Sequence, residues 1–324
     1  MRYTRFGKTD LKVSRVAFGT WQAGGDWGAP QKDGIESAIR RALDLGVNFF
    51  DTAQAYGFGE AERLLGEALA PELKSRREEI VLATKGGLRM EGDRLLRDAS
   101  PGWLRKGVED SLRFLGTDYV DLYQLHWPDP DVPVEESAGA LDEMVREGKI
   151  RYVGVSNFDE EQMAAFEKVR KLDALQPPYH LFRREIEERI LPYCAGHGVG
   201  VLVYGPLAHG LLSGRMTKQT RFPEDDWRSK SPMFQGEAFE KNLEKVEELK
   251  RFAGERGYTL PQLAVAWTLA NPAVDAAIVG ARRPDHIKGT APAAGIDLSE
   301  EELREIDRIM RGAVPVGGPA PEGM

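Results

Sequence analysis

Four side chains of different chemical types follow strand-like segments in the first half of the chain. Asp51 and Tyr56 follow the first of these segments, and Lys85 and His126 each follow one of the next two. A carboxylate at the end of a buried strand is unfavourable unless a cation or a hydrogen-bond donor meets it, so we expect these groups to pair. If the strands are parallel neighbours, all four side chains converge on one rim. The segments are 47–50, 80–84 and 119–125.

These residue types suit proton donation to a carbonyl oxygen. A phenol has an ordinary pKa of about 10 and is a weak acid near neutrality unless a neighbouring cation stabilises the phenolate. Lys85 supplies such a cation, Asp51 holds it in place, and His126 donates a hydrogen bond to an oxygen that gains negative charge. A lone Lys or His at a strand end is more often a paired structural group. The coincidence of all four favours catalysis, with Tyr56 as the proton donor.

The elements that position these residues repeat as strand followed by helix along the chain. Eight such units favour an α/β fold of the closed (β/α)8 TIM-barrel type over an open parallel sheet. A hairpin over 2–13 is expected to cap one end of the barrel. Helix 260–270 directly precedes the eighth strand, so helix 237–256 is expected to be an insertion that braces the long loop before it. The strands are expected at 15–18, 47–50, 80–84, 119–125, 151–155, 174–176, 200–204 and 276–279.

A single domain over 1–311 is expected, because no linker interrupts the repeats. Residues 312–324 form a Pro/Gly-rich tail that lacks the apolar content to pack as an element, so we expect this tail to be flexible.

The composition excludes several classes of protein. The chain of 324 residues has 44 basic and 52 acidic residues and a formal charge of −8, which argues against nucleic-acid binding. It shows neither a signal peptide nor an apolar run of membrane-spanning length, so we expect a cytoplasmic protein without a membrane partner. A single cysteine, Cys194, excludes an internal disulfide. His180, His197 and His209 lack metal-ligand spacing, so no metal is expected.

Further motifs add to the first four residues. They are Gly19-Thr20-Trp21, Gln124-Leu125-His126-Trp127-Pro128-Asp129 and Gly154-Val155-Ser156-Asn157-Phe158. With them the chain, from about Arg2 to Met310, resembles the aldo-keto reductase superfamily and is similar to its general-stress-protein and channel-β-subunit-like branches. The resemblance implies a TIM barrel and assigns Asp51, Tyr56, Lys85 and His126 the roles derived above.

The resemblance also implies a nicotinamide dinucleotide, NADPH or NADP⁺, extended across the barrel mouth. The chain has no G-x-G-x-x-G after a strand, so a Rossmann unit is unsupported. By resemblance the nicotinamide carboxamide is held by polar side chains, Tyr204 stacks on the ring, and the loop 205–214 covers the pyrophosphate. The cofactor residues expected in this way are Thr20, Trp21, Ser156, Asn157, Gln176, Tyr204, Gly205, Pro206, Leu207, Gly210, Leu212, Gly214, Arg215, Gly280, Arg282 and His286.

Arg282 is interpreted as the ligand of an adenosine 2′-phosphate, because guanidinium groups bind phosphate in a bidentate manner. This favours NADP over NAD, and the alternative is a solvated pair with Arg283. His286 and Thr290 stand where the family generally has Gln or Glu and then Asn, so the adenine end departs from the usual pattern.

Aromatic residues near strand ends could form the wall of a substrate pocket, although loop aromatics also pack the scaffold. The candidates are Trp21, Trp27, Phe58 and Trp127. The sequence therefore predicts an NADP(H)-dependent oxidoreductase that reduces small aldehydes or ketones to alcohols, or oxidises alcohols and sugars in reverse. The alternative is a redox-sensing subunit similar to potassium-channel β subunits. There the position of His126 is usually Asn, so His126 favours the enzyme.

Overall fold

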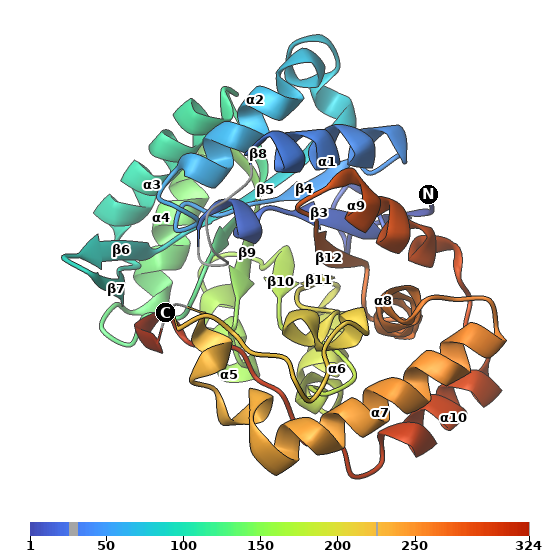
Figure 1. Cartoon of the computed structure of the whole chain (residues 1–324). Helices are drawn as coiled ribbons and strands as arrows, with labels where there is room; N and C mark the ends of the chain where they lie inside the picture. Colours follow the sequence, from blue (N-terminus) through green and yellow to red (C-terminus); the bar gives the residue numbers. More distant parts are fainter. Residues whose placement is uncertain (26–31, 225, 324) are drawn as a thin grey trace.

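A ring of parallel strands surrounded by helices dominates the computed structural model, which describes residues 1–25, 32–224 and 226–323 (Figure 1). Within these residues, eight strands close into a barrel in the order β10-β11-β12-β3-β4-β5-β8-β9. The predicted TIM barrel is confirmed. The strands are β3 (Val16–Gly19), β4 (Phe49–Asp51), β5 (Val81–Gly86), β8 (Val120–Leu125), β9 (Ile150–Ser156), β10 (Ala174–Gln176), β11 (Gly200–Val203) and β12 (Ala276–Gly280).

The ring closes between its first and last strands. β12 pairs in parallel with β3, and Val279 lies opposite Phe18 in that register. Closure leaves no unpaired sheet edge, which is how a barrel avoids strand addition by other chains.

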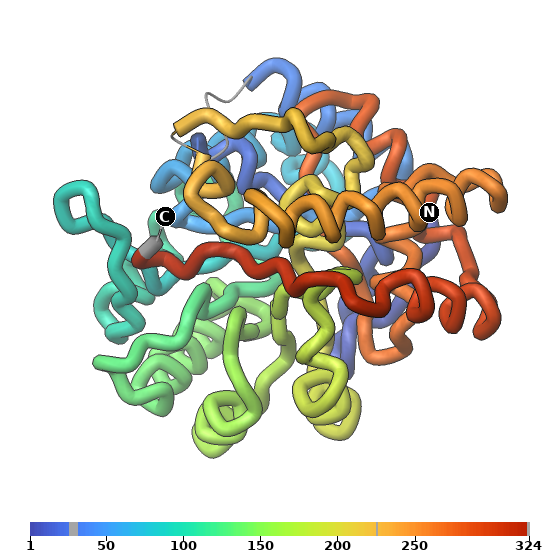
Figure 2. Tube along the Cα trace, turned by 60° about the horizontal axis from the view of Figure 1, so that its bottom comes forward, coloured from blue at the N-terminus to red at the C-terminus, as the bar shows by residue number. Residues whose placement is uncertain are grey.

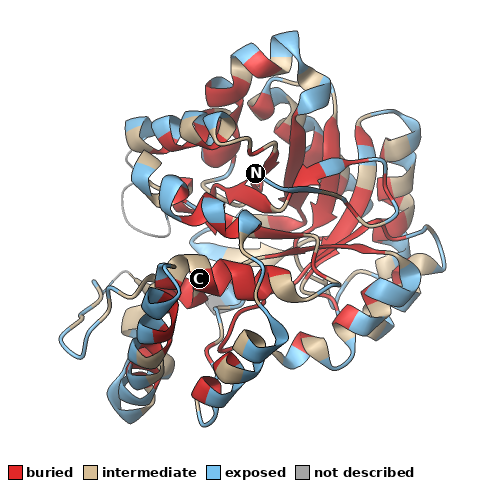
Figure 3. Cartoon of the chain, turned by 90° about the vertical axis from the view of Figure 1, so that its right-hand side faces the viewer, coloured by how far each residue is buried: buried red, intermediate tan, exposed pale blue. Residues whose placement is uncertain are grey.

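Most helices cover the outside of the barrel with one apolar face, whereas the helix Leu260–Ala270 is buried at every position from Leu263 to Leu269. In α1, Ile35, Ala38, Ile39 and Ala42 are buried at helical spacing. Figure 3 shows the same division, with buried strands inside and the exposed faces of the helices outside. The helices are α1 (Lys32–Asp44), α2 (Glu60–Ser75), α3 (Pro101–Leu115), α4 (Val134–Arg146), α5 (Glu160–Glu167), α6 (Ile190–His197), α7 (Gly236–Glu255), α8 (Leu260–Ala270), α9 (Pro284–Thr290) and α10 (Glu300–Met310). None of the described helices is long and apolar enough to span a bilayer.

The predicted N-terminal hairpin closes one end of the barrel. Strands β1 (Tyr3–Arg5) and β2 (Lys12–Ser14) pair antiparallel. Phe6, between them, is fully buried, and its ring meets Phe49 of β4 edge-on at 5.6 Å. The amino-terminal end of the barrel is therefore filled by side chains, which leaves the carboxyl ends of the strands for a site.

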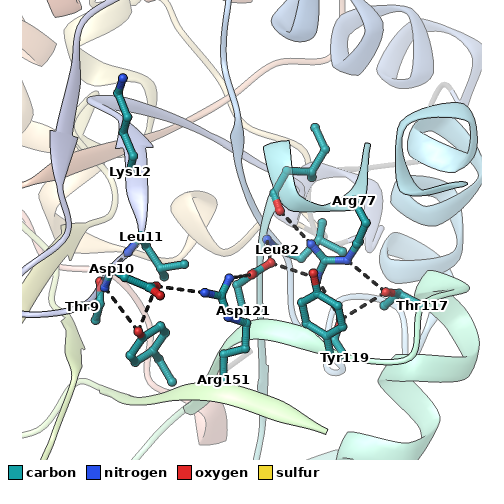
Figure 4. A network of polar contacts seen from close by, with 12 residues as sticks. Thr9, Asp10, Leu11, Lys12, Arg77, Leu82, Thr117, Tyr119, Asp121 and Arg151 are labelled. Carbon is teal, nitrogen blue, oxygen red and sulfur yellow. Dashed lines mark hydrogen bonds and ion pairs between the residues drawn. The ribbon is translucent and has the colours of Figure 1, made fainter. Parts of the chain in front are cut away.

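A charged network fixes this hairpin to the barrel (Figure 4). The buried carboxylate of Asp121 in β8 pairs with Arg77 at 2.9 Å and with Arg151 at 2.8 Å. It also accepts the backbone N–H of Leu82 at 2.9 Å. Arg151 reaches Asp10 in the hairpin turn at 2.9 Å. Each buried charge thus has a partner, as burial requires.

Two elements were not predicted from the sequence. A second hairpin, β6 (Leu88–Glu91) and β7 (Arg94–Arg97), lies between β5 and α3. Its turn contains Gly92 at φ 62°, a conformation that glycine adopts without strain. The short helix α9 directly follows β12. The alternation of apolar and polar residues from Leu88 to Glu91 could have indicated a strand, but it spans only four residues, and α9 has only seven.

The structure corrects the expectation that the C-terminal tail does not pack. Residues 312–323, here called the C-terminal strap, run from the end of α10 toward the β6–β7 hairpin (Figure 2). Val316 is fully buried, and its N–H donates to the carbonyl of Phe182 at 3.0 Å. Asn242 of α7 exchanges two hydrogen bonds with the backbone of Val314. One buried valine and several backbone hydrogen bonds hold a segment whose composition alone suggested mobility.

Candidate active site

The predicted tetrad of Asp51, Tyr56, Lys85 and His126 lies together at the carboxyl ends of β4, β5 and β8. The Nζ of Lys85 donates to Asp51 Oδ1 at 2.6 Å and to the Thr52 carbonyl at 2.8 Å. The same Nζ lies 3.4 Å from the Tyr56 hydroxyl. The ring of His126 faces that of Tyr56 edge-on at 5.7 Å. The phenol therefore stands between an ammonium group and an imidazole.

Burial strongly affects the pKa values of the charged residues in this site. Lys85 is fully buried and Asp51 is 2% exposed. Burial lowers the pKa of the Lys85 ammonium, and the charge and hydrogen bond of Asp51 oppose that shift. An ammonium group held this close to a phenol favours loss of the phenolic proton.

His126 is held as a neutral imidazole. Burial, and then the charge of Lys85, lowers its pKa well below the usual value. Within the described residues its Nδ1 has no hydrogen-bond partner. A neutral imidazole beside the phenol can donate one N–H to an oxygen without bringing a charge into the site.

Two glutamines complete the surroundings of Asp51. Gln176 Nε2 donates to Asp51 Oδ2 at 2.9 Å, and Gln124 Nε2 approaches the same oxygen at 3.5 Å. Gln176 was expected at the cofactor, whereas Gln124 was not predicted to have a role in the site. The alternation of strand residues could have found Gln124, because it lies two positions before His126 and so faces the same side.

Next to the tetrad lies a polar platform formed by Ser156, Asn157 and Tyr204. Ser156 Oγ donates to the Gln176 carbonyl at 2.8 Å. Asn157 Nδ2 donates to the His126 carbonyl at 3.1 Å, and the Tyr204 hydroxyl donates to Asn157 Oδ1 at 2.8 Å. Asn157 has φ 62°, an uncommon conformation that turns its side chain back into this network.

The loop after β11 turns sharply over the barrel mouth. Gly205, Gly210 and Gly214 have positive φ, as do Ala208 and His209 within the 3₁₀ segment Ala208–Ser213. Left-handed residues among right-handed ones direct successive backbone N–H groups toward one side, which is a geometry that binds anions.

A cavity of about 750 Å³ joins the tetrad, the platform and this loop. Most of the predicted site residues line it: Thr20, Trp21, Asp51, Tyr56, Phe58, His126, Trp127, Ser156, Asn157, Gln176, Tyr204, Gly205, Pro206, Leu207, Gly210, Gly280, Arg282 and His286. Among the described residues, Lys85, Leu212, Gly214 and Arg215 are not part of its wall. Trp27 lies outside the described residues.

One end of the cavity is basic. Arg228, Arg282 and His286 line it together with Asp226. Burial and then the nearby arginine Arg283 lower the pKa of His286. Thr290 does not extend this surface, because its hydroxyl donates to the His286 carbonyl within α9 at 3.0 Å.

The opposite end is walled by segments that the sequence analysis did not place at the site. The β6–β7 hairpin contributes Leu88, Met90, Asp93 and Leu95, and the C-terminal strap contributes Gly318 and Pro319. Trp21, which lines the same cavity, stacks on Tyr56 with ring centroids 6.2 Å apart. This part of the cavity wall is therefore largely apolar and aromatic.

Comparison with known proteins identifies the family. The model of the Aldo/keto reductase family matches residues 15–311. The chain belongs to the aldo/keto reductase family. This aldo/keto reductase is 42% identical over 98% of its length to the aldo-keto reductase YhdN of Bacillus subtilis (strain 168), of which it covers 96%. It is 33% identical to an NADH-specific methylglyoxal reductase of Escherichia coli (strain K12), over 93% of its own length and 96% of the relative's.

Solved structures agree on the fold of this aldo/keto reductase. The glycerol dehydrogenase AKR11B4 of Gluconobacter oxydans matches it with a TM-score of 0.89 and 43% identity, over 98% of this chain and 97% of that one. In the described part of the chain, no group of three or more His, Cys, Asp or Glu side chains is arranged to hold a metal ion.

Proposed function

We propose that this aldo/keto reductase uses NADP(H) to reduce small aldehydes and ketones to alcohols and can oxidise alcohols or sugars in reverse. The observation that carries the proposal is the Tyr56 hydroxyl, which lies 3.4 Å from Lys85 Nζ beside His126 at the cavity. A phenol so placed is suited to protonate a carbonyl oxygen.

The residues present fit a nicotinamide dinucleotide. The polar platform offers amide and hydroxyl groups, and the basic end of the cavity offers arginines suited to phosphate. In the proposal, Ser156, Asn157 and Gln176 hold the carboxamide and Tyr204 the ring. When bound, the cofactor supplies or accepts the hydride. The hydrogen bonds of Gln176 to Asp51 and of Asn157 to His126 connect this platform to the tetrad.

The chain's own residues handle the proton. A substrate carbonyl oxygen lies between Tyr56 and His126, so that negative charge developing on it meets two donors. Tyr56 gives up its proton, and the Lys85 ammonium stabilises the resulting phenolate. Asp51 holds Lys85 at 2.6 Å and keeps it directed at the phenol.

The preference for NADP over NAD rests on Arg282. Burial lowers the pKa of its guanidinium, and so does the neighbouring Arg228, while Asp226 opposes both. Asp226 pairs with Arg228 at 2.5 Å, and the guanidinium of Arg282 on the cavity wall is suited to bidentate contact with a 2′-phosphate. The NADH-specific Escherichia coli relative shows that this preference varies within the family.

The test is the loss of NADPH absorbance, and separately of NADH absorbance, with aromatic aldehydes, α-dicarbonyls and open-chain sugars. Tyr56→Phe should lower kcat by roughly 10²–10⁴-fold while the affinity for NADPH is kept, because it removes only the proton donor. Tyr3→Phe, at the opposite end of the barrel, is the matched control. Near-normal turnover in Tyr56→Phe would falsify the assignment. Tight NADPH binding without turnover of any carbonyl or alcohol would favour the redox-sensing alternative.

A further inference from the structure

A second buried carboxylate lies directly behind the strand that carries Lys85. Glu62, in α2, is fully buried, and its Oε1 accepts a hydrogen bond from Thr84 Oγ1 at 2.6 Å. Thr84 immediately precedes Lys85 in β5. Successive side chains of a strand point to opposite faces, so Thr84 faces the helices while Lys85 faces the barrel interior. The carboxylate therefore binds β5 on its outer, helix-facing side, one residue before Lys85.

Polar groups from several elements surround this carboxylate. Burial raises the pKa of Glu62, Ser111 of α3 beside it opposes that shift, and the facing Asp110 adds to it. Tyr123 of β8 is close enough for the Glu62 charge to raise the pKa of its phenol, after burial. The titratable groups that face Glu62 are thus Lys85, Asp110 and Tyr123.

Only some of the polar atoms in this layer have a hydrogen-bond partner. Within the described residues, four buried oxygens have no partner with hydrogen-bond geometry: Gln54 Oε1, Glu62 Oε2, Ser111 Oγ and Tyr123 OH. Two of these oxygens lie where the neighbouring backbone has glycine and therefore no Cβ. A Cβ at Gly86 would lie 1.9 Å from Tyr123 OH, and a Cβ at Gly107 would lie 2.8 Å from that hydroxyl and 3.1 Å from Gln54 Oε1. Apolar side chains would fill such a layer at lower free energy, so a buried acid here needs a reason beyond packing.

We propose that Glu62 is a positioning residue for the reaction: through Thr84 it fixes the end of β5, and its negative charge supports the ammonium form of Lys85 from behind. This inference rests on the proposed function. Burial raises the pKa of Glu62, and the Lys85 ammonium is among the groups that oppose that shift and favour the carboxylate. Burial lowers the pKa of Lys85, and the carboxylates of Asp51 and Glu62 both oppose that shift.

The decisive variant is Glu62→Gln, which keeps an oxygen for Thr84 and removes the charge. A negative charge raises the pKa of every acid near it, so its loss should move the basic limb of the kcat/KM profile for carbonyl reduction to lower pH by about one unit. The KM for NADPH should stay within about twofold, because Glu62 lies outside the cavity wall. If Glu62 has only a structural role, its replacement changes the free energy of unfolding and leaves the basic limb of the kcat/KM profile at the same pH.

The matched control is Glu72→Gln. Glu72 is a buried carboxylate in the same helix, but it pairs with Arg40 at 2.5 Å and Arg76 at 3.4 Å, away from β5. This variant should lose stability without shifting the pH profile. An equal shift in both variants, or no shift in Glu62→Gln, overturns the inference.

A second readout does not need turnover. The phenolate of Tyr56 can be titrated by ultraviolet difference spectroscopy against Tyr56→Phe, and Glu62→Gln should lower its pKa. If the wild type reduces no carbonyl, the proposed function fails while this titration still decides the role of Glu62.

Thr84→Val and Thr84→Ser test the hydrogen bond between Thr84 and Glu62 without changing the charge of Glu62. The valine should lower kcat about fivefold with KM unchanged, and the serine should restore it. If the wild type proves inactive, Thr84→Val and Thr84→Ser are compared by the phenolate titration. The valine variant should then shift the pKa of Tyr56, and the serine variant should not. If Glu62→Gln does not fold, equal behaviour of these two variants overturns the inference.

Discussion

Gln176 reaches across the barrel to Asp51, and its side-chain amide lies 2.9 Å from the carboxylate. Their strands, β10 and β4, lie on opposite sides of the closed ring. A single hydrogen bond thus spans the barrel beneath the cavity. It links a residue that the family resemblance places at the nicotinamide to the carboxylate that holds Lys85.

Gln176→Met should destabilise the protein by about 1.5–3 kcal/mol, because it removes a donor from a buried carboxylate and leaves a similar volume. The free energy of unfolding in urea measures this change. Gln219→Met, on an exposed loop, is the control and should lie within about 0.5 kcal/mol of the wild type. A stability loss equal to that of the control would contradict the importance of this bond. Gln176→Met should also lower turnover, since Asp51 then holds Lys85 less firmly.

Arg282→Leu tests cofactor preference. Removing one charged hydrogen-bonding partner of a phosphate should weaken NADPH binding by roughly 10–100-fold and leave NADH binding nearly unchanged. Fluorescence quenching or calorimetry gives both dissociation constants. Lys288→Leu, in the helix α9 that follows Arg282, serves as the control for general loss of positive charge. If Arg282→Leu weakens both cofactors equally, the 2′-phosphate assignment is wrong.

Asp275 should make stability depend on pH. Burial raises its pKa to about 6, although its carboxylate accepts the N–H groups of Val201 and Gly7 at 3.0 and 3.2 Å. The folded state binds this proton more tightly than the unfolded chain does. The resulting stabilisation is fully present below the ordinary pKa of about 4 and is lost as the pH rises through 6, by up to about 3 kcal/mol.

The measurement is urea unfolding of the wild type and Asp275→Asn between about pH 4 and pH 7. Asparagine keeps an acceptor oxygen but does not titrate, so the wild type should lose stability relative to the variant as the pH rises. Asp131→Asn, an exposed position, is the control. Parallel curves for the wild type and Asp275→Asn would show that this carboxyl group does not titrate as expected.

Arg97 should hold the C-terminal strap over the cavity. Its Nε and Nη2 donate to the two carboxylate oxygens of Glu322 at 2.7 and 3.2 Å, and Nη1 donates to the Pro128 carbonyl at 2.8 Å. The guanidinium also lies over the ring of Trp127, at 5.2 Å from its centroid. The ion pair is partly exposed, so its contribution should be at most about 1 kcal/mol.

Arg97→Gln should therefore raise the KM of carbonyl substrates by up to about fivefold and leave the affinity for NADPH unchanged. The double variant with Arg97→Glu and Glu322→Arg should recover part of the loss. Arg94→Gln, at the exposed start of β7, is the control. If the KM of carbonyl substrates is unchanged both in Arg97→Gln and in the double variant, the strap is held in place independently of this ion pair.

The sequence predicted the barrel and the convergence of its tetrad because both follow from local patterns. Apolar runs mark the strands, and the residue after each run must lie at the same rim when the strands are parallel. Packing of the strap was missed because it depends on partners distant in sequence, such as Phe182 and Asn242. The cavity wall from Leu88 to Leu95 was missed because its alternation of apolar and polar residues spans only the four residues of one strand. Glu62 resembles any other acidic residue of an amphipathic helix until its burial is known.

Closure of the ring between β12 and β3 makes the fold dependent on segments that are far apart in the chain, such as Phe18 and Val279. Contacts of such long sequence separation form late, since the loop entropy must be overcome first. Until β12 docks, both β3 and β11 present an unpaired parallel edge, and each edge can pair with another copy of the chain. Aggregation during refolding should therefore be most severe in variants that weaken β12, even when its residues are far from Tyr56.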